Sequence, residues 1–202
     1  NPDNPVIGKL DRSFSSDPEV VARQAAEVIS AHRKYGVLTA LKHFPGHGSS
    51  TLDSHHGFTD VTDTWTEEEL IPYARLIGSP GADMVMTAHV FNARLDPRWP
   101  ATLSSRTLTG LLRQKLGFKG VVISDDMQME AVREDYSLET ALERSILAGT
   151  DIIVFGNNLR YQPDIARKAA KIIRNLVRQG RIPASRIQES YDRIMGLKER
   201  LE

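Results

Sequence analysis

Four short apolar segments, each followed at once by polar side chains, constrain the fold of this chain more than any other feature. The segments are 37–41, 83–88, 120–126 and 151–158, and amphipathic helical patterns separate them. Apolar strands that alternate with helices predict βα units and a parallel sheet that is covered on both faces. We therefore expect an α/β protein.

Polar residues stand at the carboxyl end of every predicted strand. They are Lys42-His43, His89, Asp125-Asp126 and Asn157-Asn158. In a (β/α)8 barrel of the TIM type, the carboxyl ends of the strands form the active-site face. A doubly wound sheet instead binds its ligand in a crevice at one switch point. Because all four strands contribute polar groups, the pattern favours the barrel.

The number of strands predicts only part of such a barrel. A TIM barrel has eight strands and roughly 250 residues, whereas the 202 residues here supply about four βα units. Four parallel strands alone would leave sheet edges unpaired. We therefore expect residues 1–202 to form the C-terminal half of a single (β/α)8 catalytic domain. The first half, in the same polypeptide or as another chain, would be its partner.

Local signals predict where the helices begin and end. Asp17 is a candidate N-cap, with Pro18 at the first helical position. Thr66 and Glu69 have the spacing of a capping box, and Ser137 is a candidate N-cap for another helix. Helices are expected at about 18–35, 67–77, 104–116, 138–148, 163–179 and 185–201.

Composition excludes several classes of function. Lys and Arg together number 26, as do Asp and Glu, so the formal net charge is zero. A net charge of zero gives no indication of the basic surface that binds nucleic acid or anionic membranes. No apolar run approaches the roughly 18 residues of a membrane span. The chain has no cysteine, which excludes disulfides, thiolate catalysis and cysteine-ligated zinc.

Residues 42–56 hold four of the six histidines, and a metal is one explanation. Histidines four residues apart on a helix, as His43 and His47 would be, can chelate zinc. Pro45 and Gly46 lie between them and break a helix, so the zinc signal is weak. We expect no metal and no organic cofactor, with zinc as the alternative.

Proton transfer is a second explanation for the same residues. Asp53 and His55 place a carboxylate two positions from an imidazole. A carboxylate that accepts from one ring nitrogen fixes the tautomer and raises the pKa of the imidazole. Such a histidine can donate a proton near neutral pH and take one back. By itself the pattern favours an Asx-turn with a solvated histidine over a catalytic pair.

Several motifs occur together, in order, at strand ends: "KHFPGHG", "DSH", "VMTAHV", "GFKGVVISDD" and "AGTDIIVFGNN". With "NPVIGKLDRSF" near the start, this set resembles glycoside hydrolase family 3, within it the bacterial N-acetyl-β-glucosaminidases (β-hexosaminidases). The resemblance covers about residues 1–160, and the pairing of "KHFPGHG" with "DSH" is its most specific part. The first residues do not resemble a signal peptide. The compartment stays open between the bacterial cytoplasm and the cell envelope.

The resemblance implies catalytic roles for three residues. Asp125 is implied as the nucleophile, and His55 as the acid/base catalyst paired with Asp53. Strand alternation places Asp125 and Asp126 on opposite sides of their strand, and both sides are apolar, so periodicity alone does not choose between them. Asp126 is expected to accept backbone amides in the turn after the strand.

The resemblance also implies a substrate-binding set, in which Arg12, Lys42 and His43 contact the sugar. His47 is expected to hold the glycine-containing loop around it rather than to act in catalysis. For His89 the residues leave two readings open, support of the site or a buried, hydrogen-bonded histidine.

The implied activity is retaining hydrolysis of terminal β-linked N-acetylglucosamine from small carbohydrates such as peptidoglycan fragments. Two alternatives remain, phosphorolysis of the same substrates and a sugar-binding half-barrel without turnover. The isolated 202 residues are expected to be inactive, because an open barrel lacks the sugar contacts of the first four strands.

Overall fold

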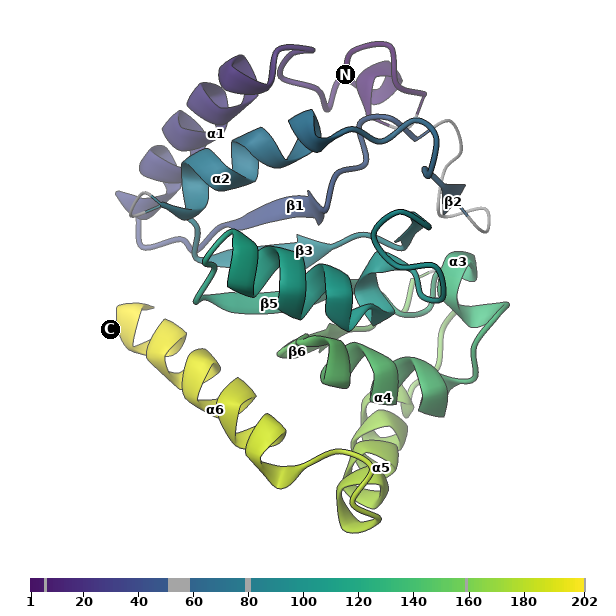
Figure 1. The fold of residues 1–202 in the computed structure, drawn as a ribbon. Helices are drawn as coiled ribbons and strands as arrows, with labels where there is room; N and C mark the ends of the chain where they lie inside the picture. Colours follow the sequence, from purple (N-terminus) through teal and green to yellow (C-terminus); the bar gives the residue numbers. More distant parts are fainter. Residues whose placement is uncertain (6, 51–58, 79–80, 159, 202) are drawn as a thin grey trace.

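A computed structural model describes residues 1–5, 7–50, 59–78, 81–158 and 160–201. Within these ranges, four strands form one sheet: β1 (Ala40–Phe44), β3 (Met84–Thr87), β5 (Val121–Asp126) and β6 (Ile152–Val154). Their order is β1-β3-β5-β6 and every neighbouring pair is parallel, so the strand arrows in Figure 1 point the same way. The predicted parallel α/β architecture is confirmed.

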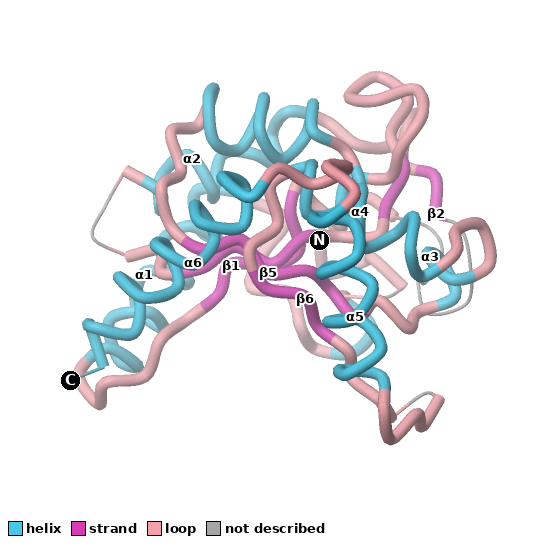
Figure 2. The backbone as a smooth tube through the Cα atoms, turned by 90° about the horizontal axis from the view of Figure 1, so that it is seen from below, coloured by secondary structure: helices cyan, strands magenta, loops and turns pink. Residues whose placement is uncertain are grey.

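Helices cover one side of this sheet and flank its edges, so that the strands lie along the inside of an arch of helices in Figure 2. The helical elements are η1 (Gly8–Leu10), α1 (Pro18–Arg33), η3 (Glu67–Leu70), α2 (Ile71–Ile77), η4 (Ala101–Leu103), η5 (Arg106–Lys115), α3 (Glu130–Arg133), α4 (Leu138–Ala148), α5 (Ile165–Arg178), α6 (Ala184–Lys198) and η6 (Glu199–Leu201). Among the residues that the structure describes, no helix has the length and apolarity that crossing a membrane requires.

Two of the predicted helix starts follow the local signals closely. The Asp17 carboxylate accepts hydrogen bonds from the first amides of α1, at 2.8 Å from the Glu19 nitrogen. The Ser137 hydroxyl accepts from the Thr140 amide at 3.1 Å at the start of α4. At the other end of α4, Gly149 has a φ of 125°, which L side chains rarely adopt.

The predicted capping box of Thr66 and Glu69 is wrong. The first turn here is the 3-10 helix η3, and the Thr66 side chain makes no capping hydrogen bond within the described ranges. The Glu69 carboxylate instead accepts from the Gly48 amide and the Ser49 hydroxyl, in the segment that follows β1. The tertiary contact therefore overrides the local one.

The first strand begins later than its apolar pattern predicts. The pattern covers 37–41, whereas β1 runs from Ala40 to Phe44. Just before the strand, the Thr39 amide and hydroxyl bind the carboxylate of Asp83, at 2.9 and 3.2 Å. The Thr39 carbonyl still accepts from the Met84 amide at 3.1 Å, so the Asp83 carboxylate binds only the amide side of Thr39. The last strand, predicted at 151–158, is likewise shorter and ends at Val154.

A second, small parallel sheet lies beyond the carboxyl ends of the main strands. It pairs β2 (Thr59–Asp60) with β4 (Val90–Phe91). Each strand has two residues, which is too short for hydrophobic alternation to reveal. Together with α3, this sheet lies on the side toward which the main strands point (Figure 1).

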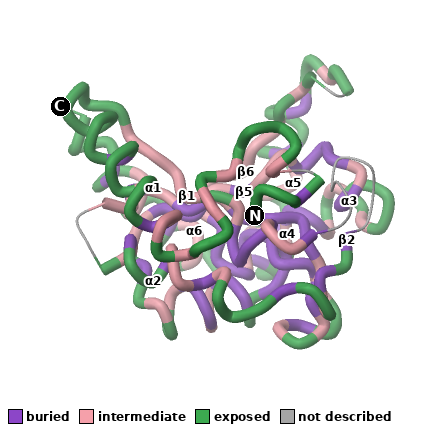
Figure 3. Tube along the Cα trace, turned by 90° about the horizontal axis from the view of Figure 1, so that it is seen from above, coloured by how far each residue is buried: buried purple, intermediate pink, exposed green. Residues whose placement is uncertain are grey.

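The largest hydrophobic core packs the sheet against helices α2 and η5. Its fully buried members include Phe44, Val85, Leu108, Leu112 and Val122. Figure 3 shows that α1 and the last residues of the chain are mostly exposed, in contrast to the strands and α4.

The amino ends of β3 and β6 are held by ion pairs to arginines of η5, α6 and η6. The side chain of Asp151, just before β6, is fully buried and pairs with Arg113, Arg186 and Arg193 at 2.7, 3.1 and 3.0 Å. Asp83, just before β3, pairs with Arg200. Polar groups at this end of a barrel-type sheet serve stability, which leaves the carboxyl ends for the site.

Candidate active site

The carboxyl ends of β1 and β5 bring a histidine and a carboxylate together. His43 on β1 and Asp125 on β5 lie on either side of β3, with 3.8 Å between Nε2 of His43 and Oδ2 of Asp125. Their side chains are 18% and 20% exposed, so both are accessible yet largely surrounded by protein. The structure thus joins two of the predicted site residues.

The Asp125 carboxylate has a defined orientation. Its Oδ1 accepts a hydrogen bond from the Asp126 amide at 2.8 Å. Its own amide donates to the Thr87 hydroxyl at 3.3 Å. The second oxygen, Oδ2, is the one that lies near His43. One oxygen is therefore held by the backbone while the other faces the neighbouring strand end.

Asp126 has a different setting, as expected from the sequence. Its Oδ1 accepts from the Gln128 amide at 2.9 Å, in the turn after β5. Its Oδ2 lies against Gly156, where an added Cβ would come within 2.5 Å of that oxygen. Asp126 therefore holds the turn that follows β5 and lies against the segment that follows β6.

The charge state of His43 follows from its burial. Desolvation lowers the pKa of His43 to about 4, and the nearby Asp125 carboxylate opposes this effect. His43 is therefore neutral at pH 7. A neutral imidazole has one donor and one acceptor nitrogen, which suits contact with an uncharged hydroxyl group.

This pKa predicts a dependence of stability on pH. Between pH 6.5, the ordinary pKa of histidine, and about 4, the unfolded chain binds a proton at His43 that the folded chain does not. The free energy of unfolding therefore falls as the pH falls through this window. Burial lowers the pKa of His89 as well, which adds a contribution of the same sign.

The test compares the full-length protein with its His43→Asn variant in urea unfolding at pH 7.5 and 4.5. The variant is expected to lose about 2 kcal/mol less stability than the wild type over this interval. Parallel losses in both proteins would contradict the assigned pKa.

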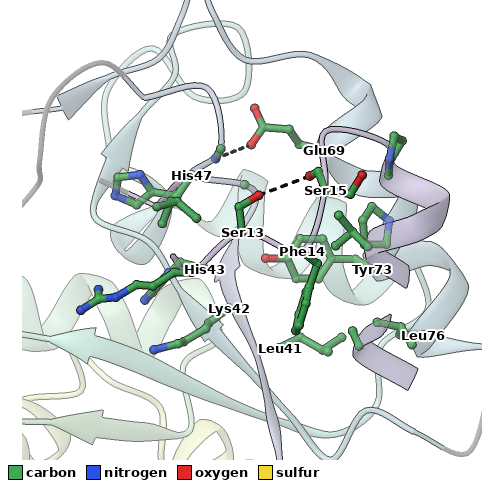
Figure 4. Close-up of a pocket in the computed structure, with 18 of the residues that line it drawn as sticks. Ser13, Phe14, Ser15, Leu41, Lys42, His43, His47, Glu69, Tyr73 and Leu76 are labelled. Carbon is green, nitrogen blue, oxygen red and sulfur yellow. Dashed lines mark hydrogen bonds between the residues drawn. The ribbon is translucent and has the colours of Figure 1, made fainter. Parts of the chain in front are cut away.

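The three predicted sugar-binding residues, Arg12, Lys42 and His43, line one cavity of about 890 Å³ along the β1 edge of the sheet. In Figure 4, Lys42 and His43 lie on one side of this cavity. An apolar wall lies on the other, formed by Phe14, Leu41, Tyr73 and Leu76. The cavity thus combines polar groups with an apolar surface, which is typical of small-molecule sites.

Glu69 was not predicted for this site, yet it shapes the segment after β1. Its Oε2 accepts from the Gly48 amide at 2.9 Å and its Oε1 from the Ser49 hydroxyl at 2.5 Å; Figure 4 shows the first of these bonds. Burial raises the pKa of Glu69. Gly46 has a φ of 132°, and a Cβ there would come within 2.7 Å of the Glu69 Cβ. The close approach requires glycine.

Asn4 and His47 hold the same segment from the other side. The Asn4 amide nitrogen donates to the carbonyls of Gly48 and Ser50, at 2.9 and 2.8 Å. His47 is buried, and its Nδ1 lies 2.5 Å from the Ser50 hydroxyl. These contacts agree with the loop-holding role expected for His47. The sequence offered no signal for Asn4.

His89 is buried, with hydrogen bonds at both ring nitrogens. Nε2 lies 3.0 Å from the Asp126 carbonyl oxygen, and Nδ1 lies 2.9 Å from the Thr102 hydroxyl. His89 is thus buried and hydrogen-bonded, and its bond to the Asp126 carbonyl is compatible with both readings that the sequence left open. Thr102 was not singled out from the sequence.

The predicted acid/base pair, Asp53 and His55, lies outside the described residues. The zinc alternative also draws on these positions. Within the described ranges, no group of three or more histidine, aspartate or glutamate side chains is arranged to hold a metal ion. The acid/base role of Asp53 and His55 therefore stays a prediction, with zinc binding as its alternative.

The fold and the site define a (β/α)-barrel-type protein in which a histidine and a carboxylate meet at the carboxyl ends of β1 and β5, beside a cavity along the β1 edge. The sequence model of the glycosyl hydrolase family 3 N terminal domain matches residues 1–197, and the chain belongs to this family. The resemblance drawn from the motifs is thereby confirmed.

Individual relatives agree with this assignment. Over its whole length, the chain is 33% identical to a segment of beta-hexosaminidase A from Pseudoalteromonas piscicida, and this segment makes up 36% of that protein. It is 37% identical to a family 3 β-N-acetylglucosaminidase from Paenibacillus sp. str. FPU-7, with a TM-score of 0.91 over 100% of this chain and 38% of that one. Zinc-bound CbsA from Thermotoga neapolitana is 38% identical, with a TM-score of 0.87 over 95% of this chain and 41% of that one. The chain thus spans less than half the length of each.

Proposed function

We propose that these residues belong to a retaining β-N-acetylglucosaminidase that hydrolyses terminal β-linked N-acetylglucosamine. The observation that carries the proposal is the position of Asp125. Its carboxylate stands at the carboxyl end of β5, with one oxygen held by the backbone and the other 3.8 Å from His43 of the cavity wall. The substrate class follows from the relatives, which are β-hexosaminidases and a β-N-acetylglucosaminidase.

In the first step, Oδ2 of Asp125 attacks the anomeric carbon of the sugar. The bond from this carbon to the leaving oxygen breaks, and its electron pair goes to that oxygen. Protonated His55 supplies the proton that the leaving oxygen needs, and Asp53 keeps the imidazole in the required orientation. The products are a glycosyl-Asp125 ester, a free alcohol and a neutral His55.

In the second step, water attacks the anomeric carbon of the ester. Neutral His55 takes a proton from the water, and the bond to the Asp125 oxygen breaks with return of its electron pair to the carboxylate. Two inversions give net retention at the anomeric carbon. The enzyme returns to its starting state without a metal or an organic cofactor.

Arg12, Lys42 and His43 are proposed to hold the sugar hydroxyl groups. The two cations donate hydrogen bonds from the cavity wall, and neutral His43 can both donate and accept. Four further βα units would pair with the edges of β1 and β6 to close the barrel, in the same polypeptide or as another chain. They would supply the remaining contacts to the substrate, for which a peptidoglycan fragment is a candidate.

The test incubates the full-length protein with an aryl N-acetyl-β-glucosaminide, in plain buffer and in phosphate buffer. We expect N-acetylglucosamine in both, with the β-anomer formed first when the reaction is followed by proton NMR. N-acetylglucosamine 1-phosphate in phosphate would show phosphorolysis instead. Binding of the sugar without turnover would support a sugar-binding module, and activity that a chelator removes and zinc restores would support the zinc alternative.

A further inference from the structure

We propose that His89 is a positioning residue that holds the backbone of Asp125 and Asp126, and with it the nucleophilic carboxylate. It contacts the Asp126 carbonyl directly and is connected to the Asp125 amide through the hydroxyl groups of Thr102 and Thr87. This proposal rests on the proposed function, because it assigns Asp125 as the nucleophile. Thr87 ends β3, His89 follows two residues later, and Thr102 lies in η4. All three side chains are at most 2% exposed.

Four contacts connect these groups into one path. The Asp125 amide donates to the Thr87 hydroxyl at 3.3 Å, and this hydroxyl lies 2.8 Å from that of Thr102. The Thr102 hydroxyl lies 2.9 Å from Nδ1 of His89. Nε2 of His89 lies 3.0 Å from the Asp126 carbonyl oxygen. The path therefore begins and ends on the backbone of the two aspartates.

The Asp126 carbonyl determines which ring nitrogen of His89 carries a proton. The Asp126 carbonyl can only accept, so Nε2 of His89 carries a proton. A neutral His89 then accepts at Nδ1 from the Thr102 hydroxyl, which in turn accepts from Thr87. Burial lowers the pKa of His89 and so favours this neutral form. The Thr102 hydroxyl also donates to the Ala88 carbonyl at 2.8 Å, so its single proton is shared between this carbonyl and Nδ1 of His89.

Fixing this backbone also fixes the carboxylate. The Asp126 amide lies between the two held groups and donates to Oδ1 of Asp125 at 2.8 Å. A shift of the Asp125-Asp126 peptide would therefore turn Oδ2 away from its line of attack. A displacement of about 1 Å near a reacting atom slows a reaction without weakening substrate binding in proportion.

The first test replaces Thr102 in the full-length protein. Thr102→Val removes the hydroxyl at nearly constant volume, and Thr102→Ser keeps it. We expect Thr102→Val to lower kcat and the rate of glycosyl-enzyme formation about tenfold, with KM changed less than about twofold. Thr102→Ser is expected to stay within about threefold of the wild type in both rates. A lower Tm with unchanged kcat in Thr102→Val would show a structural role only and overturn the proposal.

A second pair of variants tests the hydrogen bond from Nε2 of His89 to the Asp126 carbonyl. These variants also keep the proposal testable if Thr102→Val does not fold. His89→Gln can place an N–H near the position of Nε2, so it retains the bond to Asp126. His89→Asn reaches only the position of Nδ1 and loses that bond. His89→Gln is expected to keep at least about fivefold more kcat than His89→Asn, and equal values would overturn the proposal. If Asp125→Ala is inactive while these variants behave like the wild type, the positioning role fails and the proposed function stands.

Discussion

Replacing Asp125 by alanine is expected to lower kcat on an aryl N-acetyl-β-glucosaminide by about 10⁴-fold or more, because no glycosyl-enzyme can form without the nucleophile. The substrate should still bind, since Arg12, Lys42 and His43 line the cavity and all three remain in this variant. The measurement is steady-state turnover with the full-length protein, together with sugar binding by calorimetry.

Asp126→Asn is the matched control for this variant. The amide oxygen of the substituted side chain could still accept the Gln128 amide bond that Asp126 makes, so kcat is expected to stay within about tenfold of the wild type. Near-normal turnover of Asp125→Ala, or a larger loss in Asp126→Asn, would reverse the assignment of the two aspartates.

The second large effect concerns His55 and Asp53. Both His55→Ala and Asp53→Asn are expected to lower kcat/KM for a natural disaccharide by about 10³-fold, because its alkoxide leaving group needs a proton. For an aryl substrate with an acidic leaving group, the loss in kcat/KM should be about tenfold or less. This parameter reports the steps up to formation of the glycosyl-enzyme, where the acid acts.

His56→Ala is a control in the adjacent position, since the mechanism gives His56 no role. It is expected to keep kcat/KM on both substrates within about threefold. Equal losses on the disaccharide and the aryl substrate in His55→Ala would contradict proton donation by this histidine.

The parts of the fold that sequence reasoning predicted well are those that local signals determine. Asp17 and Ser137 cap α1 and α4 as expected, and the bounds predicted for the helix at 138–148 match α4. The parallel sheet followed from strands that are apolar over their whole length. Each of these features depends on residues within a few positions of one another.

The parts that it missed depend on contacts between distant segments. Just before β1, the Thr39 amide binds the carboxylate of Asp83, 44 positions further along the chain. Glu69 has the spacing of a capping residue, but it bonds to the segment after β1, 21 positions away at Gly48. No local pattern distinguishes Thr102 from other buried threonines, although its hydroxyl joins His89 to the backbone of the site. The family resemblance, rather than periodicity, separated Asp125 from Asp126.

Covalent labelling tests the central claim, that Asp125 is the nucleophile of a retaining glycosidase, most directly. A fluorinated N-acetylglucosamine analogue that forms the glycosyl-enzyme faster than it is hydrolysed is incubated with the full-length protein, which is then digested and analysed by tandem mass spectrometry. The account predicts one sugar per protein, attached at Asp125, and no label on the Asp125→Ala variant. A label at Asp126 or at another residue, or continued turnover with no label, would contradict it.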